Sequence, residues 1–236
     1  MGVLVSVILP VYNGARYLRH AIESVLDQTH QALEVLVVDD GSIDDSATVA
    51  RRLANSRVQV LSQPHSGAAA ARNHGLSRAR GDLFAFIDAD DTWESSKIDR
   101  QVAVLAARPD LDMVFGHAVN FEEAADARRG AEPRRHAPLP GHCLGTLLVR
   151  AAAFHRVGFF SVQWRIGEFL DWYARAIDVG LSHITLPDVV LNRRLHTDNL
   201  GIRELAARQD YARVVAGVLA RRLRDRQSGE EHRVRY

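Results

Sequence analysis

The sequence lacks the features that mark secreted and membrane-spanning proteins. It has a single cysteine, Cys143, which excludes a disulfide within the chain and favours a reducing compartment. No apolar run approaches the ~20 residues that a membrane-spanning helix needs. The apolar run at residues 3–11 has no basic segment before it and contains Pro10, which is unlike a signal peptide. We therefore expect a cytoplasmic protein.

Two common phosphate-binding signatures are also absent. The chain has no Gly-rich loop followed by Lys-Ser or Lys-Thr, as in many ATPases, and no Gly-x-Gly-x-x-Gly, as in dinucleotide-binding proteins. The formal net charge of +1 neither indicates nor excludes a nucleic-acid partner, and we assign none. With 236 residues, of which 47% are hydrophobic and 25% charged, the composition is that of a globular protein with a substantial core.

The first half of the chain alternates between strand and helix patterns. Short apolar runs predict strands at residues 3–9, 33–38, 58–61, 83–87 and 113–119. Helical spacing or capping residues predict helices at 15–29 and after Asp44 or Asp45, Ser66 and Ser95 or Ser96. This alternation predicts an α/β fold with a mostly parallel central sheet flanked by helices.

The second half is less regular. Residues 122–141 show neither helical nor strand periodicity, and we expect them to form a mobile surface loop. Strands are expected at 144–149, 181–186 and 189–195, helices at 168–179 and 203–226, and a flexible tail at 227–236. We predict a single domain over residues 1–226. It comprises a first half to residue 116, a second half over 117–202 and a C-terminal helix over 203–226.

Acidic residues cluster where two of the predicted strands end. Asp39-Asp40-Gly41-Ser42 follows the second strand and Asp88-Ala89-Asp90-Asp91 follows the fourth. The carboxyl ends of strands are where open α/β sheets bind ligands. In an extended strand, Asp88 and Asp90 would share one side, which suits Mg²⁺ or Mn²⁺, and Asp91 would face away. The alternative for residues 39–42 is a turn followed by a helix cap.

Four motifs in order and spacing give the sequence a resemblance to the family 2 glycosyltransferases, which have the GT-A fold. The motifs are Val7-Ile8-Leu9-Pro10-Val11-Tyr12-Asn13-Gly14, Glu34-Val35-Leu36-Val37-Val38-Asp39-Asp40-Gly41-Ser42, Gly67-Ala68-Ala69-Ala70-Ala71-Arg72-Asn73 and Asp88-Ala89-Asp90-Asp91. The resemblance continues through Val157-Gly158-Phe159-Phe160, Ile166-Gly167-Glu168 and Arg194-Leu195-His196, and so covers residues 4 to about 200.

The resemblance implies that residues 1–116 form a nucleotide-binding half and residues 117–202 an acceptor half. It also implies roles for particular residues of a nucleotide-sugar site. Pro10 and Tyr12 would border the nucleobase, and Asp40 would accept the N3–H of uracil or thymine, a proton that cytosine lacks. Arg72 would contact the base or a phosphate. Asp88 and Asp90 would contact the ribose and the metal, and Asp91 and His196 would be further metal-binding residues. The alternatives are a solvated helix residue for Arg72 and a structural histidine for His196.

The chain departs from the family pattern at the expected catalytic base. The family often has Glu-Asp at the head of the helix after the acceptor strand, and this chain has Glu168-Phe169, with Asp171 three residues on. Glu168 and Asp171 would share a helical face, so either could be the base. The alternative for Glu168 is a helix cap. Trp93 and Trp164 are candidate sugar-stacking surfaces, whereas we expect Trp172 in the core.

The resemblance implies an inverting glycosyltransferase that moves a sugar from a UDP- or dTDP-linked donor to the hydroxyl of a carbohydrate or glycoconjugate. Two rivals are a non-catalytic nucleotide-sugar-binding or scaffold protein, suggested by the changed Glu-Asp pair, and a sugar-nucleotide pyrophosphorylase, which would need an N-terminal Gly-rich loop that is missing. The Arg-rich tail is a candidate contact to anionic lipid at the inner membrane face, with a solvated tail as the alternative. The sugar, the acceptor and the oligomeric state are not readable from the sequence.

Overall fold

The computed structural model describes residues 2–122, 133–196 and 208–233. The strands are β1 (Val5–Val11), β2 (Leu33–Asp39), β3 (Val58–Ser62), β4 (Leu83–Phe86), β5 (Thr92–Trp93), β6 (Met113–Glu122), β7 (Arg134–Arg135), β8 (Leu139–Gly141), β9 (Leu148–Arg150) and β10 (His183–Leu195). The α-helices are α1 (Ala15–Leu26), α2 (Ser46–Leu53), α3 (Ala68–Leu76), α4 (Lys97–Ala107), α5 (Ala151–Val157), α6 (Glu168–Asp178) and α8 (Arg208–Arg233), with a 3₁₀ turn, η2, at Leu144–Thr146.

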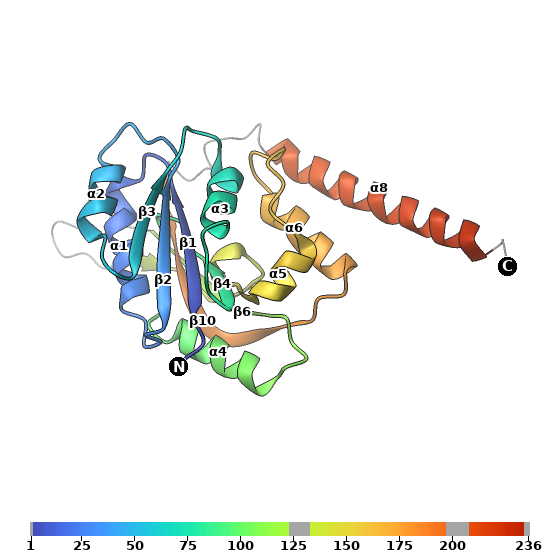
Figure 1. The fold of residues 1–236 in the computed structure, drawn as a ribbon, viewed down its shortest axis with the longest axis horizontal. Helices are drawn as coiled ribbons and strands as arrows, with labels where there is room; N and C mark the ends of the chain where they lie inside the picture. The colour runs from blue at the N-terminus through green and yellow to red at the C-terminus, as the bar shows by residue number, and fades with distance from the viewer. Residues whose placement is uncertain (1, 123–132, 197–207, 234–236) are drawn as a thin grey trace.

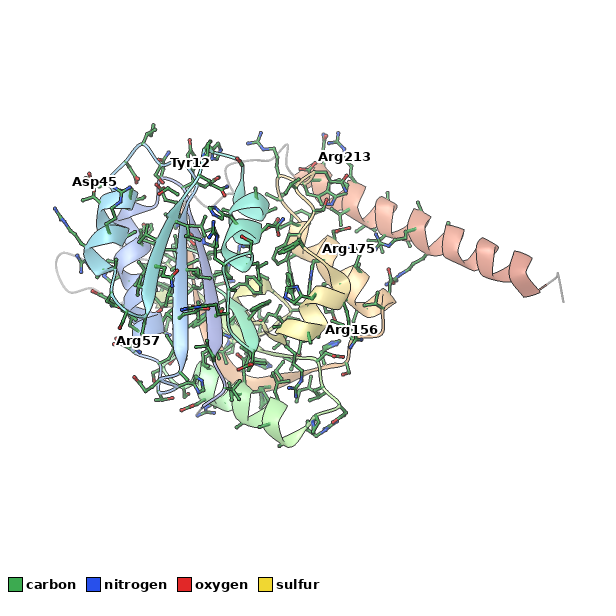
Figure 2. All side chains as sticks on the ribbon, viewed as in Figure 1. Tyr12, Asp45, Arg57, Arg156, Arg175 and Arg213 are labelled. Atoms are coloured by element: carbon green, nitrogen blue, oxygen red, sulfur yellow. The ribbon has the colours of Figure 1, made fainter. Side chains whose placement is uncertain are left out.

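All ten described strands belong to one sheet, whose order is β3-β2-β1-β4-β9-β6-β10-β5, with β7 and β8 also paired to β6. Strands β3, β2, β1 and β4 are parallel. Because β9 is antiparallel to both β4 and β6, β6 runs the same way as β4, and β10 is parallel to β6. The carboxyl ends of these six strands therefore meet at one edge of the sheet. Tyr12 lies at this edge and Arg57, just before β3, lies toward the opposite one (Figure 2).

Successive side chains of the central strands enter two different cores. Val7 and Leu9 of β1 pack into the first core, which includes residues of α1 and α4, whereas Ile8 packs into the second, which includes Phe154 of α5 and Trp172 of α6. Figure 1 shows α1 and α2 on one side of the sheet and α3, α5 and α6 on the other. A strand buried on both faces needs a continuous apolar run, which is why these segments do not alternate between apolar and polar residues.

The predicted α/β class and the mostly parallel sheet are confirmed. Some short elements were not predicted, because they are too short to show a hydrophobic periodicity in the sequence. They are the two-residue strands β5 and β7, the three-residue strand β8 and helix α5. Residues 122–141 were expected to be a loop, but two parts of this segment, β7 and β8, pair with β6. Residues 123–132 of the segment lie outside the described residues. The strand expected at 144–149 is instead η2 followed by β9.

Two other boundaries differ from the predictions. The strands expected at 181–186 and 189–195 are one strand, β10, which keeps its pairing with β6 through register shifts between Thr185 and Leu191. The C-terminal helix continues to Arg233, so residues 227–233 are helical rather than tail. Residues 203–207 and 234–236 lie outside the described residues. Helix α8 extends away from the body of the molecule (Figure 1). No helix in the described part of the chain is long and apolar enough to cross a membrane.

Candidate functional site

The loops after β1 and β2 hold each other at the carboxyl edge of the sheet. The backbone N–H of Asn13 donates to Ser42 Oγ at 3.0 Å, and Asn13 Oδ1 accepts from the N–H of Ile43 at 2.9 Å. Asn13 has a φ of 51°, which an asparagine tolerates better than most residues. Asp39 accepts the N–H of Ser42 at 3.1 Å, so the turn interpretation of residues 39–42 holds for Asp39.

Asp40 is buried, and its carboxylate accepts several hydrogen bonds from the loop between β3 and α3. It accepts hydrogen bonds from Gln63 Nε2 at 2.7 Å, from the N–H of Ser66 at 2.9 Å and from the N–H of Gly67 at 2.8 Å. The Nδ1 atom of His65 lies 2.9 Å from Asp40 Oδ2. Asp40 therefore orders the start of α3.

The two residues predicted to border a base differ in accessibility. Pro10 is a buried residue of β1, whereas Tyr12, just after the strand, is 46% exposed. The Tyr12 ring is stacked on the ring of His65, with centroids 3.9 Å apart and planes 23° apart. Tyr12 thus supplies an aromatic face near Asp40, and His65 covers part of it.

The second acidic cluster is a turn rather than an extended strand. Strand β4 ends at Phe86, and the N–H of Asp91 donates to the carbonyl of Asp88 at 3.2 Å. The two-residue alternation expected for an extended strand therefore does not place these side chains, and that expectation was wrong. Asp88 is exposed, Asp90 is half-buried, and Asp91 is buried where it accepts the N–H of Arg194 at 2.9 Å.

The end of β10 packs against this turn. His196 Nε2 lies 2.9 Å from Asp90 Oδ2, and Arg194 Nε donates to the carbonyl of Asp90 at 3.0 Å. The guanidinium of Arg194 also lies over the Tyr17 ring, 4.5 Å from its centroid. The structure therefore brings the predicted residues Asp90, Asp91 and His196 together, and it adds Arg194, a residue whose role the sequence analysis missed.

Negative charge is concentrated in the turn. Burial raises the pKa of Asp90, and the charge of Asp88 raises it further, although the hydrogen bond from His196 opposes the shift. Burial, followed by the charges of Asp90 and Asp88, raises the pKa of Asp91 well above its ordinary value. Carboxylate oxygens in this situation fit a hard divalent cation, which would relieve the repulsion. Among the described residues, no three metal-ligating side chains form a ready ligand set. A cation held here would therefore need further oxygens from a ligand such as a diphosphate.

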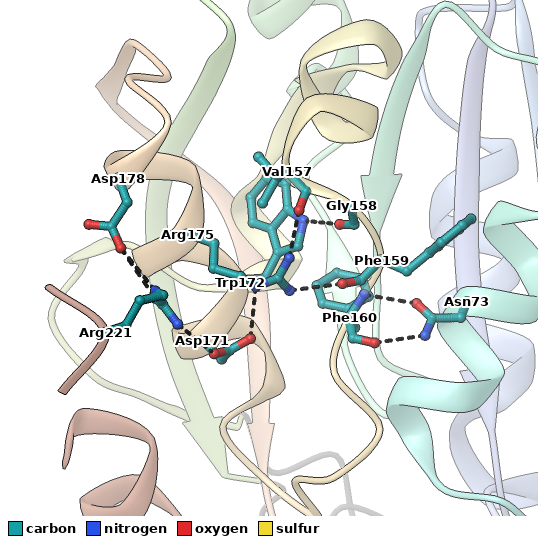
Figure 3. A network of polar contacts seen from close by, with 10 residues as sticks. All are labelled: Asn73, Val157, Gly158, Phe159, Phe160, Asp171, Trp172, Arg175, Asp178 and Arg221. Atoms are coloured by element: carbon teal, nitrogen blue, oxygen red, sulfur yellow. Dashed lines mark hydrogen bonds and ion pairs between the residues drawn. The ribbon is translucent and has the colours of Figure 1, made fainter. Parts of the chain in front are cut away.

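Arg72 connects the acidic turn to the head of α6. Its Nη2 donates to Asp88 Oδ1 at 2.5 Å, and its Nη1 is hydrogen-bonded to Glu168 Oε1. Burial alone would lower the pKa of Arg72, but the two carboxylates outweigh it and raise that pKa. Arg72 is only 5% exposed, so it is not the solvated helix residue that was the alternative to a functional role. The adjacent Asn73 pairs through its side-chain amide with the backbone of Phe160, which fixes α3 against the segment before α6 (Figure 3).

The two candidate bases lie in different environments. Glu168 is the first residue of α6 and faces Arg72 with 12% of its side chain exposed. Asp171 is buried in a separate network, where it accepts from Arg175 Nε at 3.0 Å and lies 3.8 Å from Arg221 Nη1 of α8 (Figure 3). The shared helical face that the spacing suggested does not bring Glu168 and Asp171 to one site.

The tryptophans and the lysine are placed mostly in the interior. Trp172 is fully buried, as expected, and donates to the carbonyl of Gly158 at 2.9 Å. Trp93 is 4% exposed, so the interpretation of this residue as a sugar-stacking surface was wrong; Trp164 remains half-buried. Lys97 is completely buried, with its Nζ 4.4 Å from the centroid of the Trp93 ring.

His65 and Gln63 were missed as site residues. They lie on a loop without periodicity, so the pattern analysis gave them no role. The available signal was position: Pro64 and Gly67 mark a loop between a strand and a helix, and such loops lie at the ligand-binding edge of an open α/β sheet.

The fold agrees with the comparison to known proteins. Residues 6–167, well over half of the chain, match the sequence model of glycosyl transferase family 2. The chain belongs to this family. An uncharacterized glycosyltransferase of Rickettsia felis is 29% identical over 209 residues, which cover 83% of this chain and 35% of that one. Glycosyltransferase GlyG of Streptococcus pneumoniae is 37% identical over 127 residues, covering 52% of this chain and 42% of that one.

The predicted GT-A fold is confirmed by a solved structure. The crystal structure of residues 1–349 of S. aureus TarS in complex with UDP-GlcNAc superposes with a TM-score of 0.71 at 18% identity. The match covers 83% of this chain and 60% of that chain. The chain therefore spans about a third of the length of the R. felis relative and three fifths of the TarS structure.

Proposed function

We propose that the protein is an inverting glycosyltransferase that uses a UDP- or dTDP-linked sugar and a divalent cation. The observation that carries this proposal is the arrangement along one edge of the sheet. The aromatic face of Tyr12 and the carboxylate of Asp40 lie at the ends of β1 and β2, and the acidic turn follows β4. Arg72 then links that turn to Glu168. Family membership and the neighbour's complex with UDP-GlcNAc support the same reading.

The nucleobase would lie on Tyr12 and donate its N3–H to Asp40. Uracil and thymine carry this proton, whereas cytosine does not and would place a lone pair against the carboxylate. A hydrogen bond to a charged acceptor contributes roughly 1.5–3 kcal/mol. We therefore expect UDP to bind about ten- to a hundredfold more tightly than CDP.

The diphosphate and its cation would lie at the acidic turn. Asp88 and Asp90 supply carboxylate oxygens for Mg²⁺ or Mn²⁺, and Asp91 and His196 border the same position. A cation bound here would supply positive charge to the leaving diphosphate. Arg72 is the nearest described guanidinium to Asp88 and is placed to orient the donor from the other side.

The chemical step is displacement at the anomeric carbon. The acceptor oxygen forms a bond to this carbon while the bond to the diphosphate oxygen breaks, and the electron pair of that bond leaves with the nucleoside diphosphate. Glu168 takes the acceptor proton, because its ion pair with Arg72 stabilises the carboxylate form that a general base requires. Attack from the face opposite the leaving group inverts the configuration. A carbohydrate or glycoconjugate hydroxyl is the expected acceptor.

A panel of nucleotides and nucleotide sugars tests the proposal directly. Calorimetric titration with UDP, dTDP, CDP and GDP in Mn²⁺ measures base selectivity, and donor turnover with and without candidate acceptors measures transfer. We expect uridine or thymidine nucleotides to bind most tightly and their sugars to be consumed. Tight CDP or GDP binding relative to UDP contradicts the donor assignment. UDP binding without transfer to any acceptor favours the scaffold alternative.

Helix α8 supports a second, separate proposal about location. Its exposed apolar residues recur every fourth position at Tyr211, Val215, Leu219 and Leu223. Arginines are interspersed in this helix, and basic residues near a membrane surface are attracted to anionic lipid. We propose peripheral contact with the inner membrane face. Co-sedimentation with vesicles containing phosphatidylserine, but not with vesicles of phosphatidylcholine alone, is the expected result. Equal recovery in the supernatant for both would refute it.

A further inference from the structure

His65 makes the two contacts that the proposed function assigns to the nucleobase. Its ring is stacked on Tyr12, and its Nδ1 lies 2.9 Å from Asp40 Oδ2. Because an ionised carboxylate only accepts hydrogen bonds, Nδ1 is the donor. We propose that His65 competes with the nucleobase for Tyr12 and Asp40, so that a donor binds only by displacing its imidazole. This inference rests on the proposed donor site.

The hydrogen bonds of Asp40 explain why displacement is needed. A carboxylate has about four acceptor positions, and that of Asp40 accepts from Gln63 Nε2 and from the N–H groups of Ser66 and Gly67. His65 Nδ1 lies 2.9 Å from Asp40 Oδ2, where it covers the remaining side of the carboxylate, and 3.2 Å from the backbone carbonyl oxygen of Asp40, to which it is hydrogen-bonded. A base N–H must therefore replace one of these groups. The two backbone donors are fixed by the start of α3, and Gln63 is itself held by His74 at 3.0 Å.

His65 is the donor that can leave. Its side chain is 54% exposed and lies on a loop, so a change of side-chain rotamer moves the ring into solvent without altering the backbone. The released Tyr12 face and the released acceptor position on Asp40 are adjacent, and a flat base that carries a ring N–H can take both. A base without that N–H can stack on Tyr12 but cannot donate to Asp40. Competition with His65 therefore increases the selectivity for uracil and thymine over cytosine.

The competition should depend on pH. Histidine gains its charge between about pH 5 and 8, and a protonated imidazole binds a carboxylate more strongly than a neutral one. The groups that contact the His65 side chain are Tyr12, after β1, and Asp40, after β2. The other nearby histidine, His74 of α3, contacts Gln63 instead. Acidification therefore strengthens the His65–Asp40 contact and weakens donor binding.

Titration of the wild type and His65→Ala with UDP-GlcNAc in Mn²⁺, between pH 5.5 and 8, tests the inference. UDP-GlcNAc is the suitable probe because both of its phosphates are esterified, whereas the terminal phosphate of UDP titrates near pH ~6. We expect His65→Ala to bind about three- to tenfold more tightly than the wild type at pH 5.5 and to lose most of that advantage at pH 8. Asp90 and Asp91 titrate in both proteins, so the ratio of the two affinities isolates the effect of His65.

The matched control is His20→Ala, an exposed histidine of α1, which should follow the wild type at every pH. Proton NMR adds a direct readout: the His65 ring signals should lose the ring-current shift from Tyr12 when UDP-GlcNAc binds. An affinity ratio that stays at one, or an unchanged His65 signal on binding, overturns the inference and leaves the donor site intact. Weaker binding by His65→Ala at every pH also overturns it, because His65 would then contact the base directly. If no form binds UDP-GlcNAc at any pH, the donor assignment itself fails, and the inference with it.

Discussion

The guanidinium of Arg72 on α3 is ion-paired with the carboxylate of Glu168 at the head of α6, 96 residues further along the chain. The same guanidinium is paired with Asp88, so one residue joins the acidic turn to the proposed base. Glu168 therefore does not act as an isolated helix cap. Its substitution should affect both chemistry and stability.

Replacing Glu168 with glutamine should lower the turnover rate by about 10²–10⁴-fold, because the amide cannot accept the acceptor proton. The amide oxygen can still accept from Arg72, so the free energy of unfolding should fall by only about 1–3 kcal/mol. Nucleotide affinity should change little. Steady-state kinetics, calorimetry and urea unfolding of Glu168→Gln measure the three effects, and turnover near the wild-type rate would exclude Glu168 as the base.

Asp171→Asn should show the opposite pattern. Asp171 is buried between Arg175 and Arg221, and loss of its charge weakens the attachment of α8 rather than the chemistry. We expect a lower melting temperature with turnover per folded molecule nearly unchanged. Arg221→Gln is the matched control, since it removes the same contact from the α8 side. A dead Asp171→Asn variant with wild-type stability would move the base assignment to Asp171.

Asp90→Ala should uncouple nucleotide binding from the cation. In the wild type, Mn²⁺ should raise the affinity for UDP, and removal of this carboxylate should cut that affinity by at least about tenfold. Calorimetric titration of UDP with and without Mn²⁺ measures both effects. Asp45→Ala, an exposed aspartate near the same edge, should behave as the wild type (Figure 2). Equal affinity with Mn²⁺, without it and in Asp90→Ala would refute the metal site.

Lys97 should make stability depend on alkaline pH. Burial lowers its pKa from 10.5 to about 7, so above pH 7 the folded protein holds this amine neutral while the unfolded chain keeps it charged. The unfolded state then binds more protons, and the free energy of unfolding should rise with pH by up to about 1.4 kcal/mol per unit between pH 7 and 10, with no contribution to the slope below pH 7.

Lys97→Met should flatten this dependence, whereas Arg19→Met on the exposed side of α1 should preserve it. Urea unfolding at several pH values gives the slopes. Lys97 is the only lysine of the chain, so selective ¹⁵N-lysine labelling yields one side-chain signal whose titration reports its pKa. A midpoint near 10 would show that the amine is not held neutral.

Much of the fold could be predicted from the hydrophobic pattern within individual segments of the sequence. Strands β1, β2 and β4 are buried on both faces, so each is a continuous apolar run that can be recognised in the sequence. Strands β5, β7 and β8 have two or three residues each and exist because neighbouring strands offer hydrogen bonds, which no local pattern records. The division of residues 181–195 into two strands failed because the irregularity around Val189 interrupts the pattern but not the pairing.

The candidate site was predictable to the extent that it lies at strand ends. Asp40 and the acidic turn follow buried strands, so their convergence could be expected from the parallel sheet. The contacts between side chains could not: Arg72 reaches Glu168, and His65 reaches Tyr12, only through the tertiary arrangement. The spacing of Glu168 and Asp171 suggested a shared site, but α8 supplies Asp171 with a different partner, Arg221.

The position of the acidic turn between β4 and β5, two strands of the same sheet, has a consequence for how the site responds to a ligand. Strand β5 follows the turn directly and is hydrogen-bonded to β10, while the N–H of Arg194 on β10 is bonded to Asp91. The sheet thus holds mutually repelling carboxylates in place, although in solution they would move apart and draw in water. If the proposed cation binds here, it would meet an electric field already oriented toward it and would require little reorganisation of the protein. The amides of β5 should accordingly be among the slowly exchanging ones, even though they lie only a few residues from Asp88.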